Sequence, residues 1–154
     1  MDLGLKGKTA LLTGASRGLG FAAAEALAKE GVDIAINSRN EEVLSKAGDK
    51  LAQYGTRVVS LPGDVTNPKK AEMLVGGTIA TLGKLDLLLT NAGGPPPGAF
   101  ESFNDEDWQH AIELSFMSHV RLIRAALPFL RLSESPSVLT VTSISVKQPI
   151  PNLV

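Results

Sequence analysis

The residues best suited to chemistry in the first part of the chain form a glycine-rich loop, residues 13–20, between an apolar run and an amphipathic segment. Glycine lets the chain turn with positive φ and lets a phosphate approach the backbone closely. The N–H groups and the positive dipole of a following helix attract anions. A tight turn between a strand and a helix accounts for the same glycines, so position decides between the two interpretations. The loop residues predicted to hold phosphate groups are Gly14, Ser16, Arg17, Gly18, Leu19 and Gly20.

The elements that must position this loop follow from the spacing of apolar residues. Apolar, β-rich runs predict strands at residues 9–13, 34–37, 58–61, 85–90 and 138–142. Segments of helical period lie between them, at residues 19–29, 41–53, 68–82 and 105–132. This alternation predicts an α/β fold, a three-layer doubly wound (Rossmann) parallel sheet with strand order 3-2-1-4-5. Ligands of such sheets bind at the carboxyl ends of the strands, which is where the glycine loop lies.

Length and composition predict one globular domain, residues 1–154, and exclude several other classes. Apolar residues make up 44% and charged residues 20%, and the formal net charge is −1. The near-zero charge gives no basic surface for nucleic acid or anionic lipid. No run approaches the roughly 18 apolar residues of a membrane span, and the N-terminus has no apolar signal region. We therefore expect a cytoplasmic protein that binds neither nucleic acid nor membrane.

The second predicted strand ends in residues that bear on the choice of cofactor. In dinucleotide-binding folds, an acidic residue roughly 20 positions beyond the glycine loop binds the adenosine ribose, and its charge repels a 2′-phosphate. Here Ser38 takes that place and Arg39 follows it, while Arg17 lies in the glycine loop. Two arginines facing a 2′-phosphate favour NADP (NADPH) over NAD. The competing interpretation is that each arginine is a solvated surface charge.

Motifs along most of the chain support a family resemblance. The pattern TGxxxGxG at residues 13–20, Asp64-Val65 after the third strand and Asn91-Ala92-Gly93 after the fourth come in order on the expected elements. From about residue 5 to residue 145 the chain resembles the cofactor-binding portion of the short-chain dehydrogenase/reductase family. The resemblance implies that Asp64 and Val65 contact the adenine ring, and that Asn91, Ala92 and Gly93 support the sheet near the nicotinamide ribose. Taken alone, Asp64 is also typical of an Asx turn or a helix cap.

The resemblance also assigns catalytic positions. The family uses a serine to bind the carbonyl oxygen and a tyrosine, assisted by a lysine, to supply the proton. Ser143, at the end of the fifth strand, is similar to the family's serine, with Ser145 as the fallback. Hydroxyl groups at strand ends also often satisfy only loop backbone.

Two departures from the family pattern concern the same chemistry. Ser115 takes the place of the family's helix asparagine, which holds a water of the proton relay. The one tyrosine of the chain is Tyr54, with Val58 rather than lysine four residues on, so YxxxK is absent. The family's tyrosine is expected at or just beyond Val154. Because family members are longer, we expect a fragment, a truncated product or one part of a split protein.

The function predicted is hydride transfer between NADP(H) and a small-molecule carbonyl or secondary alcohol. The alternative is a non-catalytic nucleotide-binding or regulatory module of the same fold. The resemblance implies a homo-oligomer, a dimer or a tetramer. The apolar stripe on residues 105–132 fits either the core or a subunit contact.

Two further features of the sequence bear on the site. The proline-rich loop at residues 94–98 fits either a stiff connection or a wall of the substrate site. His110 and His119 have no cysteine or acidic cluster at metal-ligand spacing, so we expect no metal.

Overall fold

The computed structural model describes residues 2–94, 96–148 and 150–151. Strands and helices alternate as the apolar runs predict, and most of them begin and end within a few residues of the predicted positions. The strands are β1 (Thr9–Leu12), β2 (Asp33–Ser38), β3 (Val58–Pro62), β4 (Leu87–Thr90) and β5 (Ser137–Thr140). The helices are α1 (Gly18–Lys29), α2 (Glu41–Ala52), α3 (Lys70–Leu82), α4 (Asp105–Ile112) and α5 (Ser118–Leu130), with short turns η1 (Phe100–Ser102), η2 (Glu113–Met117) and η3 (Ile144–Val146).

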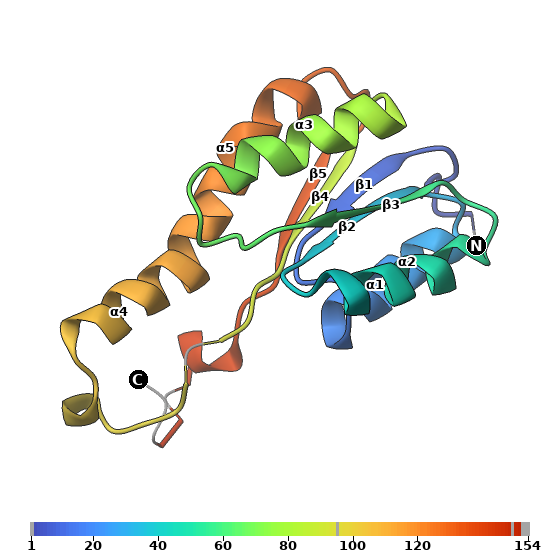
Figure 1. Cartoon of the computed structure of the whole chain (residues 1–154). Helices are drawn as coiled ribbons and strands as arrows, with labels where there is room; N and C mark the ends of the chain where they lie inside the picture. Colours follow the sequence, from blue (N-terminus) through green and yellow to red (C-terminus); the bar gives the residue numbers. More distant parts are fainter. Residues whose placement is uncertain (1, 95, 149, 152–154) are drawn as a thin grey trace.

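The described strands form one parallel sheet in the order β3-β2-β1-β4-β5. Helices α1 and α2 cover one face of the sheet, and α3 and α5 cover the other (Figure 1). The predicted doubly wound Rossmann architecture and its strand order are therefore confirmed. Within the described residues, every helix is too short or too polar to span a bilayer.

Each face of the sheet has its own apolar core, because successive side chains of a strand point to opposite faces. Leu12 and Ile36 pack toward α1 and α2, whereas Leu11 and Leu88 pack toward α3 and α5. All four side chains are almost completely buried. Burial of one such side chain stabilises the fold by about 1.5 to 3 kcal/mol, so the central strands are firmly held. Strand β5 is more exposed, and Leu139 retains 58% of its accessible surface.

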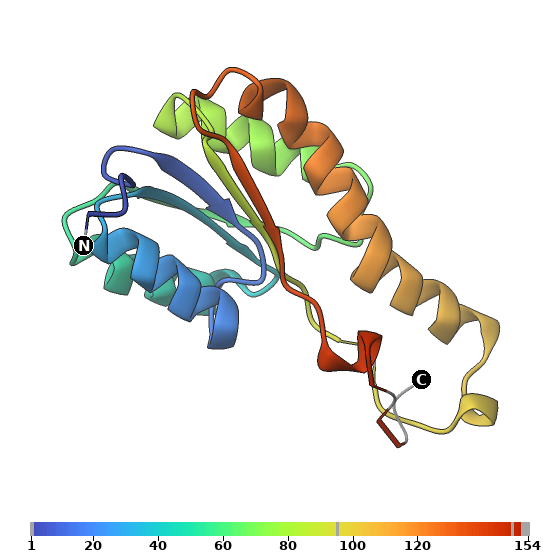
Figure 2. The same cartoon turned by 180° about the vertical axis from the view of Figure 1, so that it is seen from behind.

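The prediction of a single continuous helix at residues 105–132 is wrong, because the segment is interrupted. The structure divides it into α4 and α5, joined by the π-helical turn η2. The three segments form one rod whose α4 end extends well beyond the carboxyl ends of the strands (Figures 1 and 2). A π turn holds an extra residue and shifts the phase of the residues that follow it. Buried positions recur every four residues along η2 and α5, whereas Ile112 and Phe116 are exposed; the buried residues are Leu114, Ser118, Leu122, Ala126 and Leu130.

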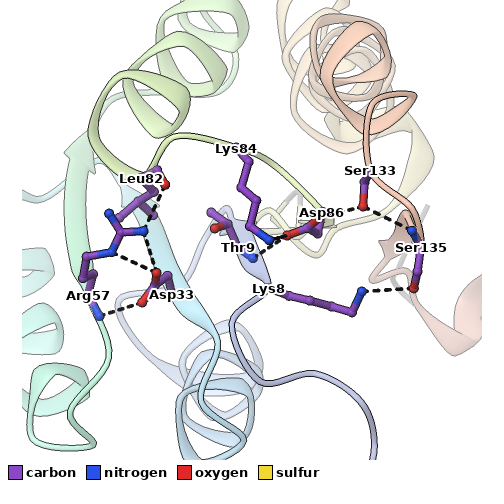
Figure 3. A network of polar contacts seen from close by, with 9 residues as sticks. All are labelled: Lys8, Thr9, Asp33, Arg57, Leu82, Lys84, Asp86, Ser133 and Ser135. Carbon is purple, nitrogen blue, oxygen red and sulfur yellow. Dashed lines mark hydrogen bonds and ion pairs between the residues drawn. The ribbon is translucent and has the colours of Figure 1, made fainter.

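The amino ends of the strands are joined by a polar network around Asp86, shown in Figure 3. The Asp86 carboxylate accepts a 2.8 Å hydrogen bond from the backbone N–H of Thr9 and a 2.6 Å bond from the Ser133 hydroxyl. The Lys84 ammonium lies 3.0 Å from the same carboxylate. Burial on its own would raise the pKa of Asp86, but the partners outweigh it, so its pKa lies below the ordinary value. One carboxylate thus joins β1, the start of β4 and the turn before β5.

Candidate nucleotide-binding site

A cavity of about 470 Å³ opens at the carboxyl ends of the central strands. It lies where the strand order reverses, between β1 and β4, which is the usual ligand crevice of a doubly wound sheet. Four connections supply its wall: the glycine loop, the β2–α2 and β3–α3 loops, and the segment after β4. The residues predicted for the cofactor that line it are Gly14, Ser16, Arg17, Gly18, Ser38, Arg39, Asp64, Val65, Asn91, Ala92 and Gly93.

The glycine loop is fixed to the segment after β4 by a reciprocal set of hydrogen bonds. The Thr13 hydroxyl donates to the carbonyl oxygen of Asn91 at 2.9 Å and accepts from its backbone N–H at 3.0 Å. The Asn91 amide donates to the carbonyl oxygen of Gly14 at 3.1 Å. Gly14 has a φ of 58°, and a Cβ there would lie 2.7 Å from the Asn91 carbonyl oxygen. The close contact therefore requires glycine at position 14.

Helix α1 presents its amino end to the same loop. Its N-cap residue, Arg17, makes no capping hydrogen bond with its side chain, whereas at α2 the Asn40 side chain accepts from the N–H of Val43. The first N–H groups of an uncapped helix remain available to an anion, which the helix dipole also attracts. A Cβ on Gly20 would lie 2.3 Å from the Gly14 carbonyl oxygen. Helix α1 therefore approaches the loop more closely than would be possible with any residue other than glycine at position 20. This cradle fits a phosphate group.

The side chain and the backbone of Asn37 together hold three segments of the cavity wall. The side-chain amide donates to the carbonyl oxygens of Leu61 and Gly63, at 2.8 and 3.1 Å. The backbone carbonyl oxygen of Asn37 accepts from the N–H of Ala15 at 3.0 Å. The end of β2, the loop after β3 and the glycine loop are thereby fixed relative to one another.

The rim of the cavity next to Asn37 carries the two arginines of the cofactor prediction. Ser38 is partly buried, and its hydroxyl donates to the carbonyl oxygen of Asn40 at 3.3 Å. Arg39 and Arg17 line the cavity and are exposed. Exposed guanidinium groups at an open rim are free to turn toward an incoming anion.

Asp64 forms an Asx turn, as one of the two sequence interpretations predicts, and it also lines the cavity. Its carboxylate accepts from the backbone N–H of Thr66 at 2.9 Å and from the Thr66 hydroxyl at 2.8 Å. Burial would raise the pKa of Asp64, but these hydrogen bonds and the electrostatic effects of Arg39 and His110 lower it below the ordinary value. Asp64 is therefore an anionic acceptor at neutral pH, suited to an N–H or O–H donor.

Other predicted residues lie outside this cavity. Leu19, in the first turn of α1, is 73% exposed. Ser115 and Ser143 are exposed, and Ser143 accepts hydrogen bonds from the Ser145 N–H at 3.2 Å and from the Ser145 hydroxyl at 2.8 Å. The structure therefore does not bring the two predicted catalytic serines into the nucleotide cavity.

Among the remaining sequence candidates, Tyr54, Pro96 and Pro97 are not part of the cavity lining. Tyr54, at the end of α2, donates a 2.8 Å hydrogen bond to Glu25. In the proline-rich loop, Pro96 and Pro97 are exposed, while Pro95 lies outside the described residues, as does Val154. Within the described part of the chain, no three His, Asp or Glu side chains are grouped as a metal ion would require. Burial lowers the pKa of His119, which favours its neutral form.

Sequence reasoning missed several residues that line the cavity. Asn37 resembles the last residue of a strand, and Gly63 resembles an ordinary turn glycine. Leu114 resembles one more apolar residue of the long predicted helix. The sequence did carry one signal for Asn37, which is its place at a strand end beside Ser38. A buried amide at such a place needs hydrogen-bond partners in neighbouring segments. The missed residues are Asn37, Asn40, Val43, Gly63 and Leu114.

The sequence model that describes short chain dehydrogenases matches residues 8–154. The chain belongs to the short-chain dehydrogenase family. The uncharacterized oxidoreductase YvrD of Bacillus subtilis is 31% identical over the whole chain, which covers 58% of that relative. The ketoacyl reductase HetN of Nostoc is 32% identical over 94% of the chain, which covers 50% of the relative. The chain thus spans about half to three fifths of these short-chain dehydrogenases.

Solved short-chain dehydrogenases have the same fold. L-sorbose reductase from Gluconobacter frateurii, in complex with NADPH and L-sorbose, superimposes with a TM-score of 0.96 and 34% identity. That match covers 99% of this chain and 59% of the reductase. A 7α-hydroxysteroid dehydrogenase in complex with NADH gives a TM-score of 0.91 and 29% identity, covering 96% of this chain and 58% of the enzyme. Short-chain dehydrogenases of this shape therefore include proteins with either nicotinamide cofactor, and a nicotinamide cofactor is supported here.

Proposed function

We propose that the chain carries the NADP(H) site of an oxidoreductase that interconverts a small-molecule carbonyl and a secondary alcohol. The observation that carries this proposal is the cavity rim, where Ser38 replaces an acidic residue and Arg39 and Arg17 border the same opening. The uncapped amino end of α1 supports the pyrophosphate part of the proposal. The relatives whose names record an activity are oxidoreductases, which favours an enzyme over a non-catalytic module.

The two arginines support a preference for the phosphorylated cofactor. A 2′-phosphate carries negative charge and oxygen acceptors, and guanidinium groups bind such acceptors through charge-assisted hydrogen bonds. One bond of this kind contributes about 1.5 to 3 kcal/mol. In the same cavity, Asp64 and Val65 would contact the adenine ring, while Asn91, Ala92 and Gly93 would support the nicotinamide ribose.

Carbonyl reduction adds a hydride to the carbonyl carbon and a proton to its oxygen. Bound NADPH would supply the hydride. Ser143 would donate a hydrogen bond to the carbonyl oxygen, where negative charge develops. Ser115 would hold a water of the proton relay with a shorter side chain than asparagine. The proton donor is expected at or beyond Val154, outside the described residues. The whole protein is proposed to act as a cytoplasmic homo-oligomer, and residues 1–154 to form one domain of it.

The experiment is a parallel titration of the chain with NADPH and NADH, followed by nucleotide fluorescence and calorimetry. We expect NADPH to bind saturably and NADH to bind at least tenfold more weakly. Arg39→Asp should weaken NADPH binding about tenfold or more, because it removes a cation and adds a charge that repels the 2′-phosphate. The NADH affinity of this variant should change little.

Arg131→Asp is the matched control, because Arg131 is exposed at the end of α5, outside the cavity lining. It introduces the same change of charge and should leave both titrations unaltered. Equal binding of NADPH and NADH would reject the NADP preference and leave a nicotinamide site. Failure of folded chain to bind either nucleotide would reject the cofactor site itself.

A further inference from the structure

The guanidinium group of Arg121 connects two separate parts of the cavity wall. Its side chain, on the first turn of α5, is only 12% exposed. It forms a bidentate ion pair with the Glu113 carboxylate, with Nη1 donating to Oε2 and Nη2 donating to Oε1 at 3.3 Å. Nη1 also lies 3.4 Å from the carbonyl oxygen of Thr66, in the loop between β3 and α3. A single cation thus contacts both the helix rod and a loop of the nucleotide cavity.

The ion pair spans the π turn. Glu113 is the first residue of η2, and Arg121 lies eight residues further, beyond its end. In a regular α-helix, residues eight apart are separated by about 12 Å along the axis, so only two long side chains can bridge them. The hydrogen bond from Arg121 lowers the pKa of Glu113 against the opposing effect of burial, which keeps the carboxylate ionised at neutral pH. The turn closed by this pair contains Leu114, which lines the cavity, and Ser115.

The other contact reaches the loop that carries Asp64. Thr66 donates its N–H and its hydroxyl to the Asp64 carboxylate, and its carbonyl oxygen faces the Arg121 guanidinium. Asp64 and Leu114 line the same cavity from these two segments. The polar chain from Asp64 through Thr66 and Arg121 to Glu113 therefore joins the loop and the π turn.

We infer that Arg121 is a positioning residue that sets the distance between the loop holding Asp64 and the π turn holding Leu114, and through it the width of the nucleotide cavity. Arg121 does not itself line the cavity among the described residues, so its effect on a ligand is indirect. The nucleotide part of this inference rests on the proposed function. The coupling between the two segments is a property of the chain alone.

The test compares Arg121→Met with Arg124→Met in the full 154-residue chain. Methionine keeps an unbranched side chain like the aliphatic part of arginine but carries no charge. Arg124 is an exposed arginine one turn further along α5 and serves as the control. Amide hydrogen exchange without nucleotide should show faster exchange in Arg121→Met at the Thr66 N–H and across residues 114–118. Neither segment should change in Arg124→Met. In NADPH titrations, Arg121→Met should weaken binding roughly three- to tenfold, and Arg121→Lys should restore part of the loss.

Glu113→Gln provides a second probe that does not depend on Arg121→Met being folded. It keeps the size of the side chain and weakens only the ion pair, and it should also accelerate exchange at the Thr66 N–H. Unchanged exchange at Thr66 in both Arg121→Met and Glu113→Gln would overturn the inference, even if residues 114–118 change. If the unaltered chain fails to bind NADPH while exchange at the two segments changes together, the proposed cofactor fails and the coupling stands.

Discussion

Replacing Gly20 by alanine should either weaken NADPH binding about a hundredfold or lower the free energy of unfolding by about 3 kcal/mol. A hundredfold loss of affinity corresponds to about the same free energy. The new Cβ would lie 2.3 Å from the Gly14 carbonyl oxygen and 2.9 Å from the carbonyl carbon, and both are backbone atoms. The contact can be relieved only if α1 moves away from the glycine loop or the loop changes shape. Either movement withdraws the N–H groups of the helix from the phosphate position. Nucleotide titration together with urea unfolding measures both effects.

Gly76→Ala is the matched control for this substitution. Gly76 lies within α3, and a Cβ there meets no atom within 4 Å. Alanine in an exposed helix interior is favoured over glycine by about 1 kcal/mol, so this variant should gain stability and bind NADPH normally. A Gly20→Ala chain with unaltered stability and unaltered affinity would show that the loop does not hold the cofactor closely.

Replacing Asp86 by asparagine should lower the free energy of unfolding at pH 7 by about 3 kcal/mol. Asparagine cannot accept hydrogen bonds from Thr9, Ser133 and Lys84 together, because one of its two terminal atoms is a donor. At least one of these three partners would then lose its acceptor. For a chain of this size the melting temperature should fall by roughly 6 to 12 °C, which calorimetry measures.

The effect of Asp86→Asn should depend on pH in a defined direction. The pKa of Asp86 is lower in the folded chain than its ordinary value of about 4, so its stabilising contribution is fully present above that pH. The contribution is lost as the pH falls through the folded pKa. The difference in stability between the two chains should therefore be largest at neutral pH and shrink below about pH 4.

Asp49→Asn separates this effect from a general loss of negative charge. Asp49 is exposed on α2, and removing its charge should alter stability by less than about 0.5 kcal/mol. A constant difference between Asp86→Asn and the unaltered chain from pH 7 to pH 3 would reject the assignment of this acid sensitivity to Asp86.

The fold was predictable because burial leaves a strong trace in the sequence. Strands covered on both faces require nearly continuous apolar runs, and the runs alternate with helical segments as a parallel sheet demands. The bounds were less predictable, because an apolar run records burial rather than hydrogen bonding. Leu85 is 98% buried and was included in the fourth predicted strand, yet β4 begins at Leu87.

The candidate site was predictable where local chemistry dictates the residue type. Gly14 and Gly18 adopt positive φ, and such positions are visible as glycines next to a strand end. Asn37 was missed because its role depends on Leu61 and Gly63, which the fold alone brings to it. Leu114 was missed because its contact with the cavity depends on how the helix rod lies against the loops, which apolar spacing does not record.

The central place of β1 also bears on the order in which the chain can fold. Its partner β2 follows directly after α1, whereas its other partner, β4, comes more than 70 residues later. The unit from β1 to β3 can thus form from contacts close in sequence, while the β1–β4 pairing must close a long loop of chain. During synthesis, one edge of β1 therefore stays open until residue 87 and its neighbours emerge, and this non-local pairing is expected to set the slow step of folding.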